Sequence, residues 1–535
     1  MPVMNRYPKL FAIAALLGAV SLAGADLPRI EKRAHGWQFT VDGKPFIILG
    51  GQVNNSSGWA ALLPEIWKTY DALGANTVEI PVYWEAIEPQ QGGFQFDNVD
   101  RIIASAREHR VHLVLLWFGS WKNGASNYVP AWVKQDPQRY RNVVNAAGER
   151  TGVISPWFEA TRNADRTAFA ALLHHLREFD QNDGTVILIQ VENESGSYGT
   201  PRDYSPEATA RFHGAVPEKL VAAMHRQPGT WEQVFGPEAE EAFSAWGTAS
   251  YINAVAAAGK SEYALPMYVN CWLSEGDSWQ RPGENYPSGG PVAGMLDVWK
   301  AAAPSLDVIA PDIYLPSHEA YVRTMTTYRR PDNPLLIPET YYQPPGPRRL
   351  FEALGEYGAI GFSPFGLDAT GWTDTSAQRM ADLADSYHLL GPMIAEISQW
   401  QTEGKLRAAV QDYDVSSRLL HFEGYDVLAE FNRPHYGFGD EGSREREGRV
   451  LIAQTGPAEF VVVGFDTRVR FRAKRGQPAT GQRAPGDGAR FLRVEEGTYS
   501  NGVWTVHQPL NGDQTDFGLN LPNKGAVYRV WLDQY

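Results

Sequence analysis

Cysteine is almost absent from this chain, whose 535 residues include only one, Cys271. A single cysteine excludes an intrachain disulfide and a cysteine-rich metal site, and its apolar neighbours predict a buried structural thiol. Positive charge is also scarce, since 48 lysine and arginine residues stand against 62 aspartate and glutamate residues, for a formal net charge of −14. This deficit argues against nucleic acid and against anionic membrane surfaces as partners.

Long apolar runs are missing too, except for one at residues 10–22. Two basic residues precede this run, and the small residues Ala23-Gly24-Ala25 follow it as a cleavage site. These features predict a secretory signal peptide over residues 1–25 rather than a membrane span. Ala25 stands where a lipoprotein signal needs cysteine, so we expect no membrane anchor and a periplasmic or secreted chain that begins near Asp26.

Apolar runs and helical segments alternate through the first two thirds of the chain. Eight strand-like runs with helices between them predict an α/β fold, a (β/α)8 TIM barrel. A long insertion is expected after the fourth run, at residues 198–263, and a closing helix at 376–398. The eight runs are 46–52, 76–84, 111–117, 186–195, 266–272, 306–314, 334–342 and 359–365.

The pattern of apolar residues changes after the closing helix. Short alternating or β-branched runs separated by Gly, Pro and Asp predict a C-terminal all-β, sandwich-like domain. The predicted organisation is a signal peptide at 1–25, a catalytic barrel with a β lead-in at 26–395, and the β domain at 396–535. Because no row of exposed aromatics is evident in the β domain, its expected role is to brace the barrel.

Charge is stacked at the end of the fourth run, where five aliphatic residues among the first six lead into Glu192-Asn193-Glu194. Carboxylates at the end of a buried strand are costly to keep for stability alone. In a barrel of this kind the C-terminal strand ends are also where catalysis takes place. The structural alternative is a strand that turns polar on reaching solvent.

A second run has the same design, because Pro334-Leu335-Leu336-Ile337-Pro338 leads into Glu339 and a pair of tyrosines. A barrel can bring Glu194 and Glu339 face to face despite their separation in sequence. Two carboxylates on either side of a sugar are what glycoside hydrolysis requires, with one protonating the leaving oxygen and the other attacking the anomeric carbon. The pair therefore predicts a glycosidase.

Several segments together resemble the glycoside hydrolase family 35 β-galactosidases, a group of retaining TIM-barrel enzymes. The resemblance covers roughly residues 40–390, and the asparagine-glutamate pair is shared with the wider clan of retaining barrel glycosidases. The segments that carry it are Asn76–Trp84, Glu88-Pro89, Gly93–Asp97, Pro130-Ala131-Trp132 and Gln190–Glu194.

The resemblance implies a role for four residues. Glu194 would be the acid/base, Asn193 would bind the sugar 2-hydroxyl, Glu339 would be the nucleophile, and the Tyr314 hydroxyl would orient Glu339. The implied activity is that of a retaining exo-β-galactosidase acting on oligosaccharides such as xyloglucan-type plant cell-wall fragments. Glu192 faces the other side of its strand and is expected to make a structural hydrogen bond.

The sequence departs from the family pattern at residues 116–121, which replace a segment that usually supplies another sugar-binding carboxylate. Glu85 is a candidate to compensate for that loss. Further candidate substrate contacts at strand ends are Tyr83, Asn270, Trp272 and Trp372, where aromatic rings could stack on sugars.

The sequence indicates no cofactor and no metal site, and it does not specify an oligomeric state. Two alternatives to a β-galactosidase stay open. One is another retaining β-glycosidase, acting on β-glucosides or β-mannosides. The other is a secreted, non-catalytic carbohydrate-binding protein on a decayed barrel, which the presence of both glutamates disfavours.

Overall fold

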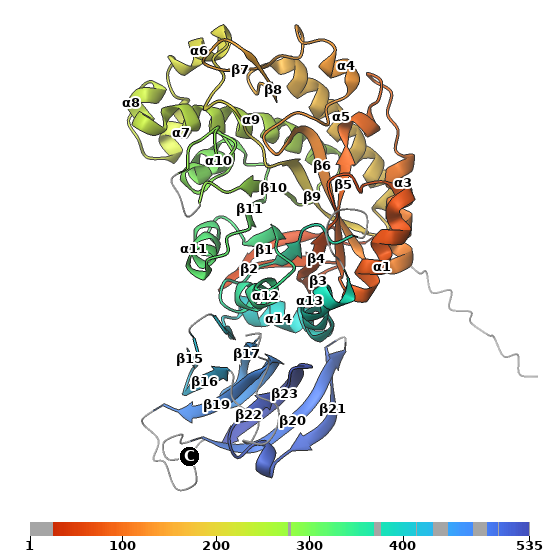
Figure 1. Ribbon diagram of the computed structural model, residues 1–535, viewed down its shortest axis with the longest axis vertical. Coiled ribbons are helices and arrows are strands. Elements are labelled where there is room, and N and C mark those ends of the chain that lie inside the picture. Colours follow the sequence, from red (N-terminus) through yellow and green to blue (C-terminus); the bar gives the residue numbers. More distant parts are fainter. Residues whose placement is uncertain are drawn as a thin grey trace, which may run out of the picture.

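A computed structural model describes residues 25–275, 280–368, 376–412, 415–431, 448–474, 489–500 and 502–533. Its upper part in Figure 1 contains a barrel with surrounding helices, and its lower part consists of β-sheets. Residues 1–24 of the predicted signal peptide, Trp372 and residues 475–488 of the C-terminal part lie outside the described residues.

The upper part is a closed barrel of eight parallel strands. The predicted (β/α)8 barrel is thus confirmed. The strands are nearly all buried, which explains why most read as continuous apolar runs rather than alternating ones. In barrel order they are β4 (Ile48–Gln52), β5 (Thr77–Tyr83), β6 (His112–Lys122), β9 (Val186–Asn193), β10 (Met267–Trp272), β11 (Val308–Ile313), β12 (Leu336–Thr340) and β13 (Gly361–Pro364).

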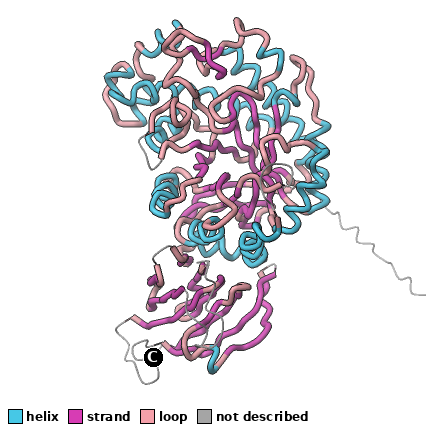
Figure 2. Tube along the Cα trace, in the orientation of Figure 1, coloured by secondary structure: helices cyan, strands magenta, loops and turns pink. Residues whose placement is uncertain are grey.

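Helices cover the outside of the barrel, as the cyan tubes in Figure 2 show. In the first of them, Pro64 stands at the start and Gly74 ends the helix in the left-handed conformation, while Ile66, Tyr70 and Leu73 are buried at helical spacing. The main helices are α1 (Leu63–Leu73), α3 (Asp97–His109), α5 (Glu159–Asp180), α9 (Ala239–Glu262), α10 (Leu296–Ala302), α11 (His318–Tyr328), α12 (Gly346–Gly355) and α13 (Ala377–Leu390).

Two additions extend the barrel. The predicted lead-in hairpin is present as the sheet β1 (Arg29–Arg33), β2 (Gly36–Val41) and β3 (Lys44–Phe46). Its turn places Asp42 and Gly43 at positive φ, the conformation that a two-residue hairpin turn requires. The predicted insertion after β9 contains α6 (Pro206–Phe212), α7 (Glu218–Ala223), α8 (Trp231–Phe235) and α9. Shorter elements are α2 (Trp84–Ile87), α4 (Ala131–Lys134), β7 (Asn142–Val144) and β8 (Arg150–Ile154).

The C-terminal part contains two antiparallel sheets, which confirms the all-β prediction. Val450 and Ile452 pack toward the smaller sheet, whereas Leu451 and Ala453 join the core formed with α12. The larger sheet is therefore covered on both faces, and the β domain is fastened to the barrel. Its strands are β14 (Leu406–Val410), β17 (Arg449–Gly456), β18 (Glu459–Phe465), β23 (Ala526–Asp533), β20 (Arg490–Ser500) and β21 (Val503–Leu510). The smaller sheet has β15 (Ser417–His421), β16 (Tyr425–Phe431), β19 (Thr467–Ala473) and β22 (Leu519–Leu521), and α14 (Ile394–Thr402) precedes both sheets. The predicted domain limits stay a prediction.

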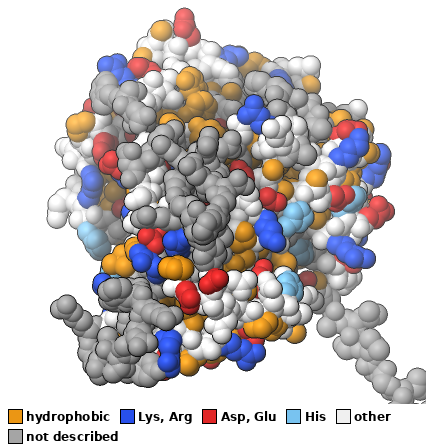
Figure 3. All heavy atoms as spheres, turned by 60° about the horizontal axis from the view of Figure 1, so that its bottom comes forward, with side chains coloured by type: hydrophobic (Ala, Val, Ile, Leu, Met, Phe, Trp, Pro, Cys, Tyr) orange, Lys and Arg blue, Asp and Glu red, His pale blue; other side chains and the backbone are white. Residues whose placement is uncertain are grey.

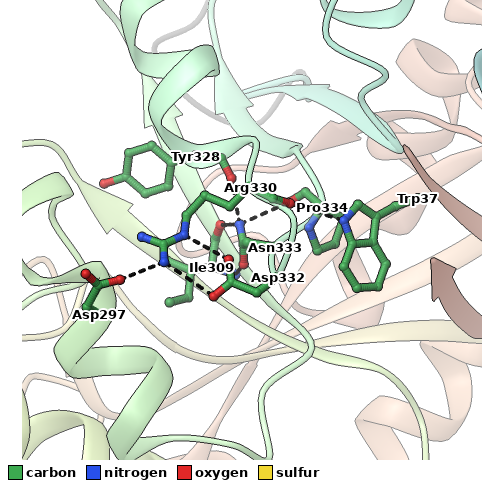
Figure 4. A network of polar contacts seen from close by, with 8 residues as sticks. All are labelled: Trp37, Asp297, Ile309, Tyr328, Arg330, Asp332, Asn333 and Pro334. Carbon is green, nitrogen blue, oxygen red and sulfur yellow. Dashed lines mark hydrogen bonds and ion pairs between the residues drawn. The ribbon is translucent and has the colours of Figure 1, made fainter. Parts of the chain in front are cut away.

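A polar network fixes the N-terminal ends of β11 and β12, which lie at what is called here the lower end of the barrel (Figure 4). The Asn333 side chain lies at its centre, where Oδ1 accepts from the Ile309 backbone N–H at 2.9 Å and Nδ2 donates to the carbonyl oxygens of Ile309, Tyr328 and Pro334. Trp37 of the lead-in sheet donates its Nε1–H to the Arg330 carbonyl. These bonds hold β11 and β12 in register at their N-terminal ends.

The outer surface carries charges of both signs. On the face shown in Figure 3, acidic and basic side chains of the described residues are interspersed rather than gathered into a single basic field. Within the described part of the chain, no helix combines the length and the apolar character needed to cross a membrane.

Candidate active site

Three buried carboxyl groups meet at the C-terminal end of the barrel. Glu194 directly follows β9, Asp312 lies in β11 and Glu339 lies in β12. The β11–β12 register places Asp312 beside Glu339, and closure of the barrel brings Glu194 to them. One oxygen from each group lies within 4.8 Å of the others. The two glutamates singled out in the sequence are thus neighbours, and Asp312 is a third member that sequence reasoning missed.

Glu339 receives a donor on each carboxylate oxygen. The Tyr314 hydroxyl donates to Oε1 at 2.8 Å, and the Gln52 side-chain amide donates to Oε2 at 3.3 Å. These two bonds fix the plane of the carboxylate. The contact between Tyr314 and Glu339 is the one that the family resemblance implied, whereas Gln52 comes from β4 and was not expected.

Asn270 joins the other two carboxyl residues. Its Oδ1 accepts from the backbone N–H of Glu194 at 2.8 Å, and its Nδ2 donates to Asp312 Oδ2 at 2.7 Å. Both polar atoms of the Asn270 side chain are thus bonded to other protein groups. Asn270 had been predicted as a substrate contact, and the structure places it where it positions Glu194 and Asp312.

Burial and crowded negative charge raise the pKa values of Glu194 and Asp312. The pKa of Glu194 rises to about 7, first because of burial and then because of the charge of Glu339, while the nearby Lys122 ammonium opposes the rise. The pKa of Asp312 also rises well above its ordinary value, through burial and then through Glu339 and Glu194. A glutamate with a pKa near neutrality is suited to donate a proton and later to accept one.

Lys122, the last residue of β6, is a buried cation beside this cluster. Its ammonium donates to Asn193 Oδ1 at 2.8 Å. Because lysine can only donate, it fixes which way the Asn193 amide points. Asn193 Nδ2 is then left buried and without a partner among the described residues, so it can donate to a ligand. Lys122 was also missed, although it directly follows the segment that departs from the family pattern.

The backbone around Glu194 adopts an uncommon conformation. Glu192 has φ +65° and Glu194 has φ +42°, both in the left-handed region that disfavours side chains with a Cβ atom. Glu192 is held there because its Oε2 accepts from the Trp121 backbone N–H at 2.7 Å. The expected structural role of Glu192 is confirmed, and burial together with Asp165 raises its pKa well above the ordinary value.

Two other predicted contacts have partners elsewhere. The Tyr83 hydroxyl accepts from the Gly58 N–H and donates to the Asn55 carbonyl oxygen. Glu85 forms a surface ion pair with Lys134 at 3.3 Å, and both side chains are partly exposed. Among the described residues, no hydrogen bond joins Tyr83 or Glu85 to the carboxyl cluster, so their substrate roles stay predictions. The substrate role of Trp372 also stays a prediction, because Trp372 lies outside the described residues.

Aromatic residues follow three of the polar residues at the strand ends. Three successive strands end in the same pattern of a polar residue, any residue and an aromatic residue, and side chains two apart in a strand share a face. Each of these polar residues is thus followed, two positions on, by an aromatic residue at or just beyond the end of its strand. The three patterns are Asn270-Cys271-Trp272, Asp312-Ile313-Tyr314 and Glu339-Thr340-Tyr341. This repeat is the signal in the sequence that could have found Asp312.

The spacing of the three carboxyl oxygens would also suit a cation. The surrounding groups argue for an organic, hydroxyl-rich ligand instead, because amide and hydroxyl hydrogens already point at Glu339 and Asp312. The charge of Lys122 would in addition repel a metal ion.

Comparison with known proteins identifies two regions of the chain. Residues 38–288 match Glycosyl hydrolases family 35, and residues 383–522 match a domain of unknown function, DUF5597. A beta-galactosidase of Xanthomonas manihotis is 30% identical over 221 residues, which are 40% of this chain and 34% of that protein. Beta-galactosidase 17 of Arabidopsis thaliana is 26% identical over 191 residues, 34% of this chain and 25% of that protein. The chain thus spans about a third of the length of the first relative and a quarter of that of the second.

One solved structure supports the fold alone. It is a catalytic mutant of Gan42B, a GH42 beta-galactosidase from G. stearothermophilus, with a TM-score of 0.52 and 12% identity, covering 91% of this chain and 98% of that one. The matched region 38–288 includes Asn193 and Glu194 together with the strands β4, β5, β6, β9 and β10. The resemblance seen in the sequence is therefore confirmed over residues 38–288, which are similar to glycosyl hydrolases family 35.

Proposed function

We propose that the chain is a retaining exo-β-galactosidase in which Glu339 is the nucleophile and Glu194 is the acid/base. The observation that carries the proposal is the oxygen spacing of at most 4.8 Å between these carboxyl groups. A retaining mechanism needs the two groups about 5 Å apart, whereas an inverting one needs roughly 6.5–9.5 Å to admit a water molecule.

The first step breaks the glycosidic bond. A Glu339 oxygen attacks the anomeric carbon while the bonding electron pair moves to the leaving oxygen, which takes the proton of Glu194. Burial and the charge of Glu339 keep that proton on Glu194 in the free enzyme, consistent with a pKa of about 7. Tyr314 and Gln52 hold the attacking carboxylate in place.

The second step returns the enzyme to its starting state. Esterification removes the charge of Glu339, so the pKa of Glu194 falls and the ionised group can take a proton from water. The water oxygen attacks the anomeric carbon, and the ester electrons return to Glu339. Asn193 donates its Nδ2–H to the sugar 2-hydroxyl, a bond that strengthens in the transition state, and the buried, unpartnered Nδ2 supports this role.

The choice of galactose is supported by the family match and by the names of both curated relatives. Exo action, oligosaccharide substrates of the xyloglucan type and export through a signal peptide are parts of the same proposal. The runner-up is a retaining β-glucosidase or β-mannosidase, since the double displacement itself does not depend on the orientation of the 2- and 4-hydroxyl groups in which these sugars differ from galactose. A non-catalytic sugar-binding protein is disfavoured because both glutamates carry supporting donors or neighbours suited to catalysis.

The first experiment measures nitrophenol release by the purified protein from aryl β-galactoside, β-glucoside, β-mannoside and α-galactoside. We expect the β-galactoside to be hydrolysed fastest, and proton NMR to show the β-anomer of galactose as the first product. Preference for another β-sugar would retain the mechanism and reject the substrate. An α-anomer as first product would reject the roles of both glutamates.

A further inference from the structure

Exposed aromatic rings of the barrel gather at one end. Among its described residues, the large aromatic side chains that are more than a third exposed are Trp59 at 41%, Tyr198 at 40% and Tyr341 at 37%. They follow β4, β9 and β12, so all three lie on the face where the strands end in the carboxyl cluster. An exposed aromatic ring loses the stabilisation that burial would give it, which makes this clustering a sign of ligand contact.

Tyr198 stands beside Trp272 at the end of β10. Their ring centroids are 5.8 Å apart, with 40° between the ring planes. Trp272 shares a strand face with Asn270, whose amide donates to Asp312 inside the barrel. Trp272 thus lies two residues beyond Asn270 on the same face of β10, and the Tyr198 ring packs beside it at the end of that strand.

The backbone holds Tyr198 close to Glu194. The Glu194 carbonyl oxygen accepts from the Gly124 N–H at 3.0 Å, and the Gly124 carbonyl oxygen accepts from the Tyr198 N–H at 3.2 Å. On either side of Tyr198, Ser197 exchanges two backbone hydrogen bonds with Ser288, and the Gly199 N–H donates to the Gly283 carbonyl oxygen at 2.7 Å. The ring is thus displayed from a backbone that is tied on both sides.

The other exposed ring near the cluster differs in its bonding. The Tyr341 hydroxyl donates to the Tyr314 carbonyl oxygen, and its ring meets that of Tyr314 edge to face. That pair stands beside Glu339 and supports the proposed nucleophile. In the described part of the chain, the Tyr198 hydroxyl has no hydrogen-bond partner, so Tyr198 is the ring left available on the side of Glu194.

From this arrangement we propose that Tyr198 and Trp272 form a stacking platform for the sugar on the leaving-group side of the scissile bond. The inference rests on the proposed function, in which Glu194 protonates the leaving oxygen and its surroundings therefore face the leaving group. An aromatic pair on a fixed backbone, with the Tyr198 ring exposed and the Trp272 ring partly buried, suits the apolar face of a pyranose ring. The substrate class is then a galactosyl oligosaccharide whose aglycone is itself a sugar, rather than a galactoside of a small alcohol.

The test compares a substrate that reaches the platform with one that does not. We measure kcat/KM for β-galactosyl fluoride, whose leaving group is too small to touch the rings, and for the disaccharides galactosyl-β-1,4-glucose and galactosyl-β-1,2-xylose. In Tyr198→Ala we expect kcat/KM for the better disaccharide to fall about tenfold and that for the fluoride to stay within about twofold. Tyr198→Phe keeps the ring and serves as the matched control, with both values near wild type.

Each outcome decides one of the two proposals. Equal losses for fluoride and disaccharide in Tyr198→Ala would show that the ring supports the cluster rather than the aglycone, and unchanged disaccharide hydrolysis would show that it supports neither. A wild-type protein that hydrolyses the fluoride but neither disaccharide would also overturn the platform. Wild-type inactivity on the fluoride would instead overturn the proposed galactosidase function itself.

Discussion

The N-terminal, or lower, end of the barrel and its C-terminal, or upper, end use asparagine in opposite ways. At the lower end, the Asn333 amide is bonded through both its oxygen and its nitrogen, to the backbones of three residues. At the upper end, Asn193 is bonded through its oxygen alone, to Lys122, and its buried nitrogen has no partner among the described residues. A buried donor without a partner costs roughly 1–3 kcal/mol.

That difference separates a structural network from a binding site. The hydrogen bonds of the lower network offset the cost of burying its polar groups. The network therefore contributes to stability and fixes the strand register. The upper cluster crowds acidic groups and leaves a donor unpaired, a cost that a bound sugar would relieve. The comparison predicts that changes at the lower end reduce stability and that changes at the upper end reduce activity.

The largest effect is expected from the two glutamates. Glu339→Gln removes the nucleophile and Glu194→Gln removes the proton donor, so each variant should lower kcat for a galactosyl disaccharide by about 10⁴-fold or more with little change in thermal midpoint. In Glu194→Gln the loss should be much smaller for an aryl galactoside whose leaving group needs no proton. Substantial disaccharide activity in either purified variant would refute the assigned roles.

The matched pair Asn193→Ala and Asn333→Ala tests the comparison itself. We expect Asn193→Ala to lower kcat/KM about 10²-fold while keeping the thermal midpoint, and to cost little with a 2-deoxygalactoside that lacks the hydroxyl it binds. Asn333→Ala should lower the free energy of unfolding by about 3 kcal/mol, because several buried backbone groups lose partners. Activity per folded molecule should persist there. Loss of stability in Asn193→Ala together with loss of activity in Asn333→Ala would contradict the assignment of binding to the upper end and of stability to the lower end.

Glu79 lies inside the barrel in β5, and burial raises its pKa from 4.5 to about 8. Between these values the folded state keeps a proton that the unfolded state releases, so this group stabilises the fold at low pH and its contribution is lost as the pH rises toward about 8. The slope is about 1.4 kcal/mol per pH unit for one proton. Thermal midpoints measured from pH 5 to 8 should fall less steeply in Glu79→Gln than in the wild type, and identical slopes would count against a protonated Glu79.

The smallest effect concerns the pH profile. The acid must carry its proton, so kcat/KM should decline as the pH rises through about 7, the pKa of Glu194. Lys122 lowers that pKa, so Lys122→Met should move the decline to higher pH while also weakening catalysis through Asn193. Lys68→Met, at an exposed ion pair on α1, is the control and should leave the profile unchanged. A decline that stays at the wild-type pH in Lys122→Met would separate this cation from the titration of Glu194.

The sequence predicted the fold well because periodicity is a local property. Buried parallel strands appear as apolar runs, and the signals of α1, namely its apolar spacing, its proline and the glycine after it, all lie within one short segment. The carboxylates at residues 194 and 339 were visible for the same reason, since each ends a buried strand. Their closeness followed from the barrel prediction.

The sequence by itself thus determined the barrel, the β domain and the two carboxylates at the strand ends. Only the tertiary structure decided that Asp312 joins them, that Lys122 orients Asn193, and that Tyr198 stands beside Trp272. These relations depend on contacts between strands and loops distant in the chain, and on the left-handed backbone at Glu192 and Glu194 that local preferences oppose. Local periodicity cannot encode such contacts, because closure of the barrel creates them.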